Sequence, residues 1–197
     1  SIDQNTKKVT IYGTTTNDWR VVKFKCGYRD IIEQNYITCV TIAEDVTSIE
    51  NFAFQWCSSL TSVNLPEKLN SIGEGVFAHC NKLTSVAISA GVSSIEDKTF
   101  NNCSKLTSVI LPEALELIGN YAFLSCSSLT SVTFPEGLKS INYMAFSRCT
   151  SLSSLTFPEG LQVIGMSAFC NCLSLTSIIL PKSLKAENLG VDCFQGT

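Results

Sequence analysis

Residues 106–128 read LTSVILPEALELIGNYAFLSCSS, and this pattern recurs along the chain at intervals of 23 residues. Each copy opens on a leucine or isoleucine followed by Thr or Ser, at Ile37, Leu60, Leu83, Leu106, Leu129, Leu152 and Leu175. A phenylalanine column keeps the same register at Phe54, Phe77, Phe100, Phe123, Phe146 and Phe169. A cysteine follows each of these phenylalanines by three residues. A fixed period of this length indicates a solenoid, in which each repeat forms one coil of a stack.

The distribution of apolar residues within the repeat predicts how a coil folds. One 23-residue coil cannot enclose a core, whereas stacked coils bury each apolar column against its copies above and below. The opening Leu-Thr-Ser-Val-x-Leu predicts a short strand, which the following proline ends because proline cannot donate to a strand ladder. We expect parallel strands near residues 38–42, 61–65, 84–88, 107–111, 130–134, 153–157 and 176–180. The Gly-x-x-Ala-Phe-x-x-Cys half is too short for a long helix, so we expect a short helical or 3-10 turn on the outer face.

The two ends of the chain depart from the repeat. Residues 1–36 contain Lys8–Ile11, which resembles the strand half of a coil, and then a longer insertion. We expect this segment to be an N-terminal cap, with a degenerate repeat and one helix near residues 27–35. Residues 37–197 make seven coils, the last of them distorted because Leu189 and Gly190 come two residues later than the period predicts. The predicted organisation is one continuous solenoid domain.

The pattern LTSVxLPExLxxIGxxAFxxC resembles the BspA-like class of leucine-rich repeats, over residues 37–197. The resemblance implies an α/β fold, a right-handed horseshoe with a concave parallel β-sheet. It also implies a surface or secreted protein that adheres to host or matrix proteins, and it implies no catalytic residues. Because folds host many functions, the adhesion role is an analogy from fold and repeat class.

Composition and motifs exclude several classes of function. The net charge of −3 comes without a Lys/Arg cluster, so neither nucleic acid nor an anionic membrane is an expected partner. No apolar run approaches the roughly 18 residues of a membrane-spanning helix, so no membrane insertion is predicted for this fragment. The phosphate-binding and hydrolase motifs are absent. We expect neither an enzyme nor a cofactor.

The ten cysteines fall into two groups. The column from Cys57 to Cys172 predicts buried thiols, because in-register neighbours lie about 4.8 Å apart and a relaxed disulfide needs Cβ atoms about 3.8 Å apart. The remaining four are candidates for disulfides that clamp the ends, Cys26 with Cys39 and Cys170 with Cys193. The only histidine, His79, lies in an outer column that indicates a solvated loop, so no metal site is expected.

Two surfaces are candidates for binding a protein or glycan ligand, such as a host or matrix protein. The first is the concave strand face, comprising Asn64, Ser85, Ala87, Ser108, Ile110, Ser131, Thr133, Ser154 and Thr156. The second is an outer-loop group, comprising Tyr121, Tyr143, Met144 and Met166. The first is the favoured site, because concave faces of solenoids are common binding surfaces. The alternative function is a structural spacer that projects another domain and binds nothing.

Overall fold

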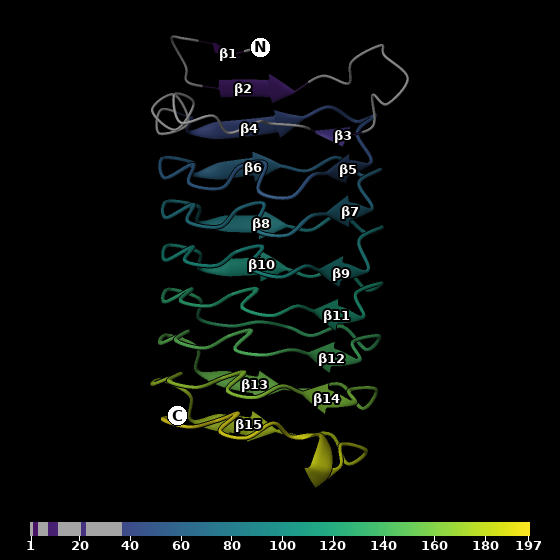
Figure 1. The fold of residues 1–197 in the computed structure, drawn as a ribbon, viewed down its shortest axis with the longest axis vertical. Coiled ribbons are helices and arrows are strands. Elements are labelled where there is room, and N and C mark those ends of the chain that lie inside the picture. Colours follow the sequence, from purple (N-terminus) through teal and green to yellow (C-terminus); the bar gives the residue numbers. More distant parts are fainter. Residues whose placement is uncertain (1, 4–7, 12–20, 23–36) are drawn as a thin grey trace.

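The computed structural model describes residues 2–3, 8–11, 21–22 and 37–197. Its coils follow one another along an almost straight axis in Figure 1, so the curved horseshoe implied by the resemblance does not appear in this view. The helix expected near residues 27–35 and the thiol of Cys26 lie outside the described residues. From here on, the strand face is the solvent-exposed side of the strands that open the coils, such as Ser85–Ala87 and Ser108–Ile110.

Most coils contribute strands to two strips that run along the stack. The first strip contains β2 (Lys8–Ile11), β4 (Cys39–Ile42), β6 (Ser62–Asn64), β8 (Ser85–Ala87), β10 (Ser108–Ile110), β13 (Ser154–Thr156) and β15 (Ser177–Ile179). The second contains β3 (Val21–Val22), β5 (Ser48–Ile49), β7 (Ser71–Ile72), β9 (Ser94–Ile95), β11 (Leu117–Ile118), β12 (Ser140–Ile141) and β14 (Val163–Ile164). Figure 1 shows the arrows of the first strip pointing across the coil and those of the second pointing back.

The strands pair in register with a shift of one repeat. Val109 pairs with Val86, and Ile118 pairs with Ile141, each pair being 23 residues apart. Within residues 39–179 every assigned strand pair is parallel, which confirms the solenoid. Among the described residues, the ladders form five short sheets instead of one continuous sheet. At the N-terminal end, β1 (Ile2–Asp3) runs antiparallel to β2.

The strand expected at residues 130–134 is not formed, which corrects one element of the prediction. The segment still lies in the stack, because the Thr130 N–H donates to the Thr107 carbonyl at 3.5 Å and the Ser153 N–H donates to the Thr130 carbonyl at 3.3 Å. Val132 is buried and Thr133 is exposed, so the inward and outward alternation of the neighbouring strands is kept.

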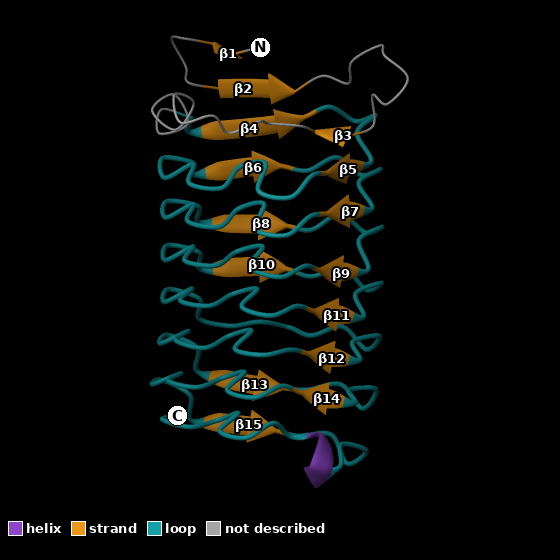
Figure 2. Cartoon of the chain, in the orientation of Figure 1, coloured by secondary structure: helices purple, strands orange, loops and turns teal. Residues whose placement is uncertain are grey.

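The expected helical turns of the outer face, and with them the α/β class, are also wrong. Among the described residues the one helix is the 3-10 turn η1 (Ala186–Asn188), and Figure 2 shows loops on the remainder of the outer half. The reason lies in the backbone hydrogen bonds: the Phe123 N–H donates to Ala145 of the next coil at 2.7 Å. An α-helix would direct that N–H to a residue four positions earlier in its own coil.

Left-handed backbone conformations recur at two positions of each outer turn, counted from the Leu or Ile that opens the coil. The non-glycine members have φ between 50° and 66°. Position 16 comprises Phe52, Gly75, Lys98, Tyr121, Met144 and Ser167, and position 20 comprises Trp56, His79, Asn102, Ser125, Arg148 and Asn171. Their N–H groups point along the stack, as in the 2.9 Å bonds from Tyr121 to Tyr143 and from Ser125 to Ser147.

The core consists of the columns that the repeat predicts. Neighbouring phenylalanines stack face to face, with the ring of Phe123 centred 5.2 Å from Phe100 and 4.9 Å from Phe146. From Cys80 to Cys172, the thiol of each cysteine in the column donates a hydrogen bond to a phenylalanine carbonyl of the preceding coil. Cys126 Sγ, for example, donates to Phe100 O at 3.2 Å. The Cys column therefore supplies both small apolar volume and a hydrogen bond between coils.

The last coil accommodates its two additional residues in η1. After this 3-10 turn, Leu189 forms a parallel bridge to Ile164, and the Gly190 N–H donates to the Ile164 carbonyl at 2.7 Å. The same bond joins Gly165 to Ile141 one coil earlier. The insertion thus bulges locally, and the coil returns to register for its final turn.

Candidate interaction surface

The strand face carries the side chains of positions 3 and 5 of each coil. Because position 4 points into the core, its neighbours on the same strand point outward. All nine residues predicted for this face are exposed: Asn64, Ser85, Ala87, Ser108, Ile110, Ser131, Thr133, Ser154 and Thr156. Ile110 stands near the middle of the stack with 67% of its surface exposed. The structure therefore brings the predicted residues together on one side of the solenoid.

Two rows of hydroxyl groups border this face, and they differ in what they bond. Thr61 Oγ1 donates to the Thr38 carbonyl of the preceding coil at 2.8 Å, and Thr107 does the same to Thr84 at 3.0 Å. The threonine row therefore links coils. Within the described part of the chain, the serine hydroxyls at position 3, such as that of Ser108, make no protein hydrogen bond. The serine row can consequently donate to or accept from a ligand.

The outer-loop residues gather into a second surface, which we call the loop patch: Tyr121, Tyr143, Met144 and Met166. The two tyrosine rings meet edge to face with centroids 5.0 Å apart. Desolvation and a hydrogen bond with Tyr143 raise the pKa of Tyr121. Met166 is 49% exposed, and its carbonyl accepts the N–H of Met144 at 3.1 Å. The patch thus spans three consecutive coils.

Val191 extends the loop patch and was missed at the sequence level. Met166 is position 15 of its coil, and Val191 takes the equivalent place in the last coil, where its carbonyl accepts the Ser167 N–H at 3.0 Å. The side chain of Val191 is 69% exposed. Earlier members of this column are polar, for example Asn51 and Asp97. A comparison of the two halves of the column would have revealed the change from polar to apolar residues.

Burial determines the chemistry of the cysteines. Desolvation raises the pKa of Cys103 and of Cys172 to about 12, and it raises the pKa of Cys126 well above its usual range. These thiols stay protonated at neutral pH and are poor nucleophiles. Cys170 and Cys193, the candidates for a disulfide at this end, are both free thiols in the structure. Cys39 is also a free thiol.

His79 is more sheltered than the solvated loop that its column predicted. Its ring stacks on Trp56 with centroids 3.6 Å apart and planes 7° from parallel. Desolvation by this packing lowers the pKa of His79. No group of three metal-ligating side chains occurs in the described ranges of the chain.

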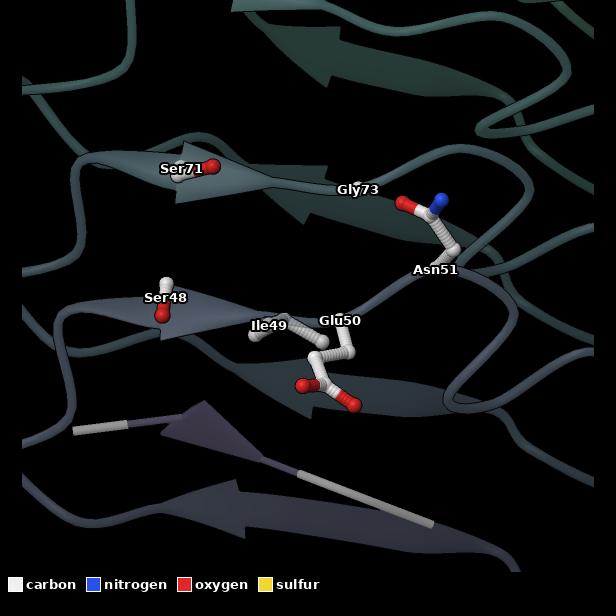
Figure 3. A pocket seen from close by; sticks show the side chains of 6 residues that line it. All are labelled: Ser48, Ile49, Glu50, Asn51, Ser71 and Gly73. Atoms are coloured by element: carbon white, nitrogen blue, oxygen red, sulfur yellow. The ribbon is translucent and has the colours of Figure 1, made fainter. Parts of the chain in front are cut away.

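A shallow depression of about 440 Å³ lies over the second strip and was not predicted. Figure 3 shows its lining, which comprises Ser48, Ile49, Glu50, Asn51, Ser71 and Gly73. Asn51 Oδ1 accepts the Glu74 N–H at 2.9 Å and lies over Gly73, where a Cβ atom would stand only 2.4 Å from that oxygen. The lining contains neither a cysteine nor a histidine, and Glu50 is its only charged side chain.

Comparison with known proteins places this geometry in a family. The sequence model of the family described as BspA type leucine rich repeat region matches residues 30–136 and 116–197 of this chain. The chain belongs to the BspA-type leucine-rich-repeat family. No curated protein matches it.

Several solved structures of bacterial proteins resemble this solenoid. A leucine-rich repeat protein of T. pallidum is 25% identical, with all of this chain and 84% of that chain covered and a TM-score of 0.75. One from Eubacterium ventriosum is 26% identical, with 75% and 45% covered and a TM-score of 0.62. The pneumococcal vaccine antigen PcpA shares the fold at 16% identity, with 79% and 55% covered and a TM-score of 0.51. No helix in the described part of the chain is long and apolar enough to cross a membrane.

Proposed function

We propose that this BspA-type solenoid is the protein-binding module of a cell-surface or secreted adhesion protein, and that it recognises its partner through the strand face. One observation carries the proposal. Position 5 is exposed in every coil and changes from Asn64 to Ala87, Ile110, Thr133 and Thr156, whereas the buried columns barely change. A packing column must repeat, but a recognition surface must differ from coil to coil to distinguish one partner from another.

The strand face also has the anatomy of a small interface. Ile110 and Ala87 supply an apolar centre, since they are neighbours in the register of β8 and β10. The unbonded serine hydroxyls and the polar residues Asn64 and Thr133 surround that centre. Protein–protein interfaces have an apolar core surrounded by a polar rim, so a protein partner would match both kinds of group on this face. This composition favours a protein as the partner, with a host or matrix protein as the specific class.

The loop patch is the alternative location for binding. Its tyrosines and methionines are residue types enriched at interfaces, and Tyr is common among energetic hot spots. Against it, three of its four members are half-buried, so part of their surface already packs between coils. The strand face has no comparable second role, which is why we assign recognition to it.

Binding assays with two triple variants test the proposal. The wild-type chain is applied to an array of purified matrix proteins, cell-surface ectodomains and glycans, and the Kd of each hit is measured by biolayer interferometry. The strand-face variant carries Ala87→Glu, Ile110→Lys and Thr133→Glu, and the matched loop-patch variant carries Tyr121→Ser, Tyr143→Ser and Met144→Ser. Circular dichroism confirms that both remain folded.

We expect the strand-face variant to weaken binding to a protein hit at least 100-fold and the loop-patch variant to change it less than about threefold. The reverse result would move the site to the loop patch. Hits confined to glycans would contradict the proposed class of partner. A chain that binds nothing on the array would favour the structural spacer.

A further inference from the structure

The depression over the second strip is shared by two successive coils, residues 37–59 and 60–82, which we call coil 1 and coil 2. Its volume of about 440 Å³ falls within the range of small-ligand sites, roughly 300–1,000 Å³. Most of the lining is polar, and it contains no Lys, Arg or His. Hydroxyl, amide and carboxylate groups without a cation suit a ligand that is rich in hydroxyl groups and carries no negative charge.

Two glycines of coil 2 determine how the side chains of coil 1 lie beside the depression. Coil 2 is the only one of the seven coils with glycine at both position 14 and position 16, which are Gly73 and Gly75. A Cβ atom at Gly73 would collide with Asn51 Oδ1, and one at Gly75 would stand 2.5 Å from Phe52 Cδ1. Both side chains of coil 1 therefore rest on bare backbone of coil 2. Packing of this kind fixes a binding group before the ligand arrives, which lowers the entropic cost of binding.

Asn51 and Ser71 present hydrogen-bonding groups to this space. Because Asn51 Oδ1 accepts the Glu74 N–H at 2.9 Å, its NH2 group is directed elsewhere, and it donates to no group in the described part of the chain. The hydroxyl of Ser71 is exposed and makes no hydrogen bond to the residues that the structure describes. Figure 3 shows Asn51 reaching from coil 1 toward Gly73, with Ser71 on the neighbouring strand. A ligand can therefore bond both groups without breaking a protein hydrogen bond.

An exposed aromatic ring stands at the outer-turn end of the depression. Phe52 directly follows Asn51, its ring lies on Gly75, and 37% of its surface is exposed. The face of an aromatic ring is negative and attracts the slightly positive C–H groups of a ligand. A sugar ring offers both kinds of surface, because its hydroxyl groups bond polar side chains and its C–H groups pack on aromatic rings. The combination of a polar depression and one aromatic ring thus favours a sugar over an ion or a purely apolar ligand.

We propose that the depression binds a neutral hexose of a glycan, with Asn51 and Ser71 bonding its hydroxyl groups and Phe52 contacting its C–H face. The Glu50 carboxylate in the lining disfavours a sugar that carries a carboxylate or sulfate, because like charges repel. The site goes beyond the proposed recognition function and does not depend on it, since it lies over the second strip and not on the strand face.

Other coils supply substitutions that the fold already accepts at these positions. Leu117 occupies the position of Ser71 two coils later, and Ser167 occupies the position of Phe52. We therefore expect Ser71→Leu to fill the depression, and Phe52→Ser to remove the ring, without unfolding the chain. Ser140→Leu makes the first change at the same position of residues 129–151 and is the matched control.

NMR titration of the ¹⁵N-labelled 197-residue chain with D-glucose, D-galactose, D-mannose and N-acetyl-D-glucosamine, up to 50 mM, tests the site. We expect at least one neutral sugar to shift the signals of the Ser71 and Gly73 amides and of the Asn51 side chain in a saturable manner. The uronic acid of that sugar should bind at least tenfold more weakly. Ser71→Leu should abolish the shifts and Phe52→Ser should raise the Kd at least fivefold, whereas Ser140→Leu should leave the Kd unchanged.

Four results would overturn the proposal. They are binding of none of the four neutral sugars, equal binding of the uronic acid, a Ser71→Leu variant that still binds, and a Ser140→Leu variant that loses the sugar as fully as Ser71→Leu. The strand-face triple variant should bind the sugar like wild type, and loss of the sugar there would move the site to the strand face. Loss of a protein hit by that triple variant bears only on the strand-face proposal.

Discussion

Replacing Phe123 by alanine should remove the ring at the middle of the stacked phenylalanine column. The side chain has no exposed surface, and its ring lies 5.2 Å from Phe100 and 4.9 Å from Phe146. Truncating a fully buried phenylalanine costs about 3–5 kcal/mol of unfolding free energy. We expect the upper half of this range, because backbone bonds such as that from Phe123 to Ala145 fix the coil spacing and oppose collapse of the cavity.

Urea denaturation followed by circular dichroism measures this loss. With an m-value of about 2 kcal/mol/M, a loss of about 4 kcal/mol lowers the denaturation midpoint by about 2 M. Phe194→Ala is the matched control at the end of the column, where the ring is partly exposed and stacks on Phe169 at 5.6 Å. It should cost about half as much. Equal shifts for the two variants, or a shift below 0.5 M for Phe123→Ala (about 1 kcal/mol at this m-value), would refute the interior role of the column.

Three further predictions concern the thiols and the close contacts between coils. Because the pKa of Cys103 is about 12 in the folded chain and about 9.0 when unfolded, its contribution to stability is complete below pH 9 and is lost as pH rises toward 12. Above pH 9 the free energy of unfolding should therefore fall by about 1.4 kcal/mol per pH unit for this residue, which lowers the urea midpoint, and Cys103→Ala should reduce that slope. At pH 8 in the native state, iodoacetamide should label the partly exposed Cys170 before Cys103, as peptide mass spectrometry would show; simultaneous labelling would contradict the buried column. Gly165→Ala should cost at least about 2 kcal/mol, since its Cβ would stand 2.6 Å from the Asn142 carbonyl carbon. Gly137→Ala, whose Cβ would stand 3.2 Å from the Glu113 carbonyl oxygen, should cost less, and similar denaturation midpoints would exclude the close approach at Gly165.

The sequence predicted the columns that packing repeats. The Phe and Cys registers, the parallel first strip and the inward Val at position 4 all follow from apolar spacing, because every coil meets the same neighbours. The exposed side of the strands could be predicted as well, because successive residues of a strand point to opposite faces: Val109 is buried, so Ile110 points outward. This is why the exposed strand-face residues could be named before the structure.

The outer half was predicted less well because its spacing fits two conformations. Phe123 and Cys126 are three residues apart, which suits a helical turn. The same spacing suits the observed turn, whose N–H groups bond the next coil, and single-coil periodicity does not distinguish the two. The second strip was missed because a strand of two residues such as Ser140–Ile141 carries too little alternation to signal itself. Likewise, Val191 follows Met166 by 25 residues instead of 23, so its place in the column depends on the displaced register of the last coil.

Both proposals depend on the 23-residue coil as the structural unit, and two deletions test this claim most directly. Removing residues 106–128 joins Lys105 to Leu129 and keeps every column in phase. Removing only residues 106–117 puts all later coils out of phase with the earlier ones. We predict that the first deletion leaves a chain that unfolds cooperatively in urea with a native-like circular dichroism spectrum. The second should leave no cooperative transition. If both deletions unfold the protein, or both are tolerated equally, the in-register coil is not the unit from which this protein is built.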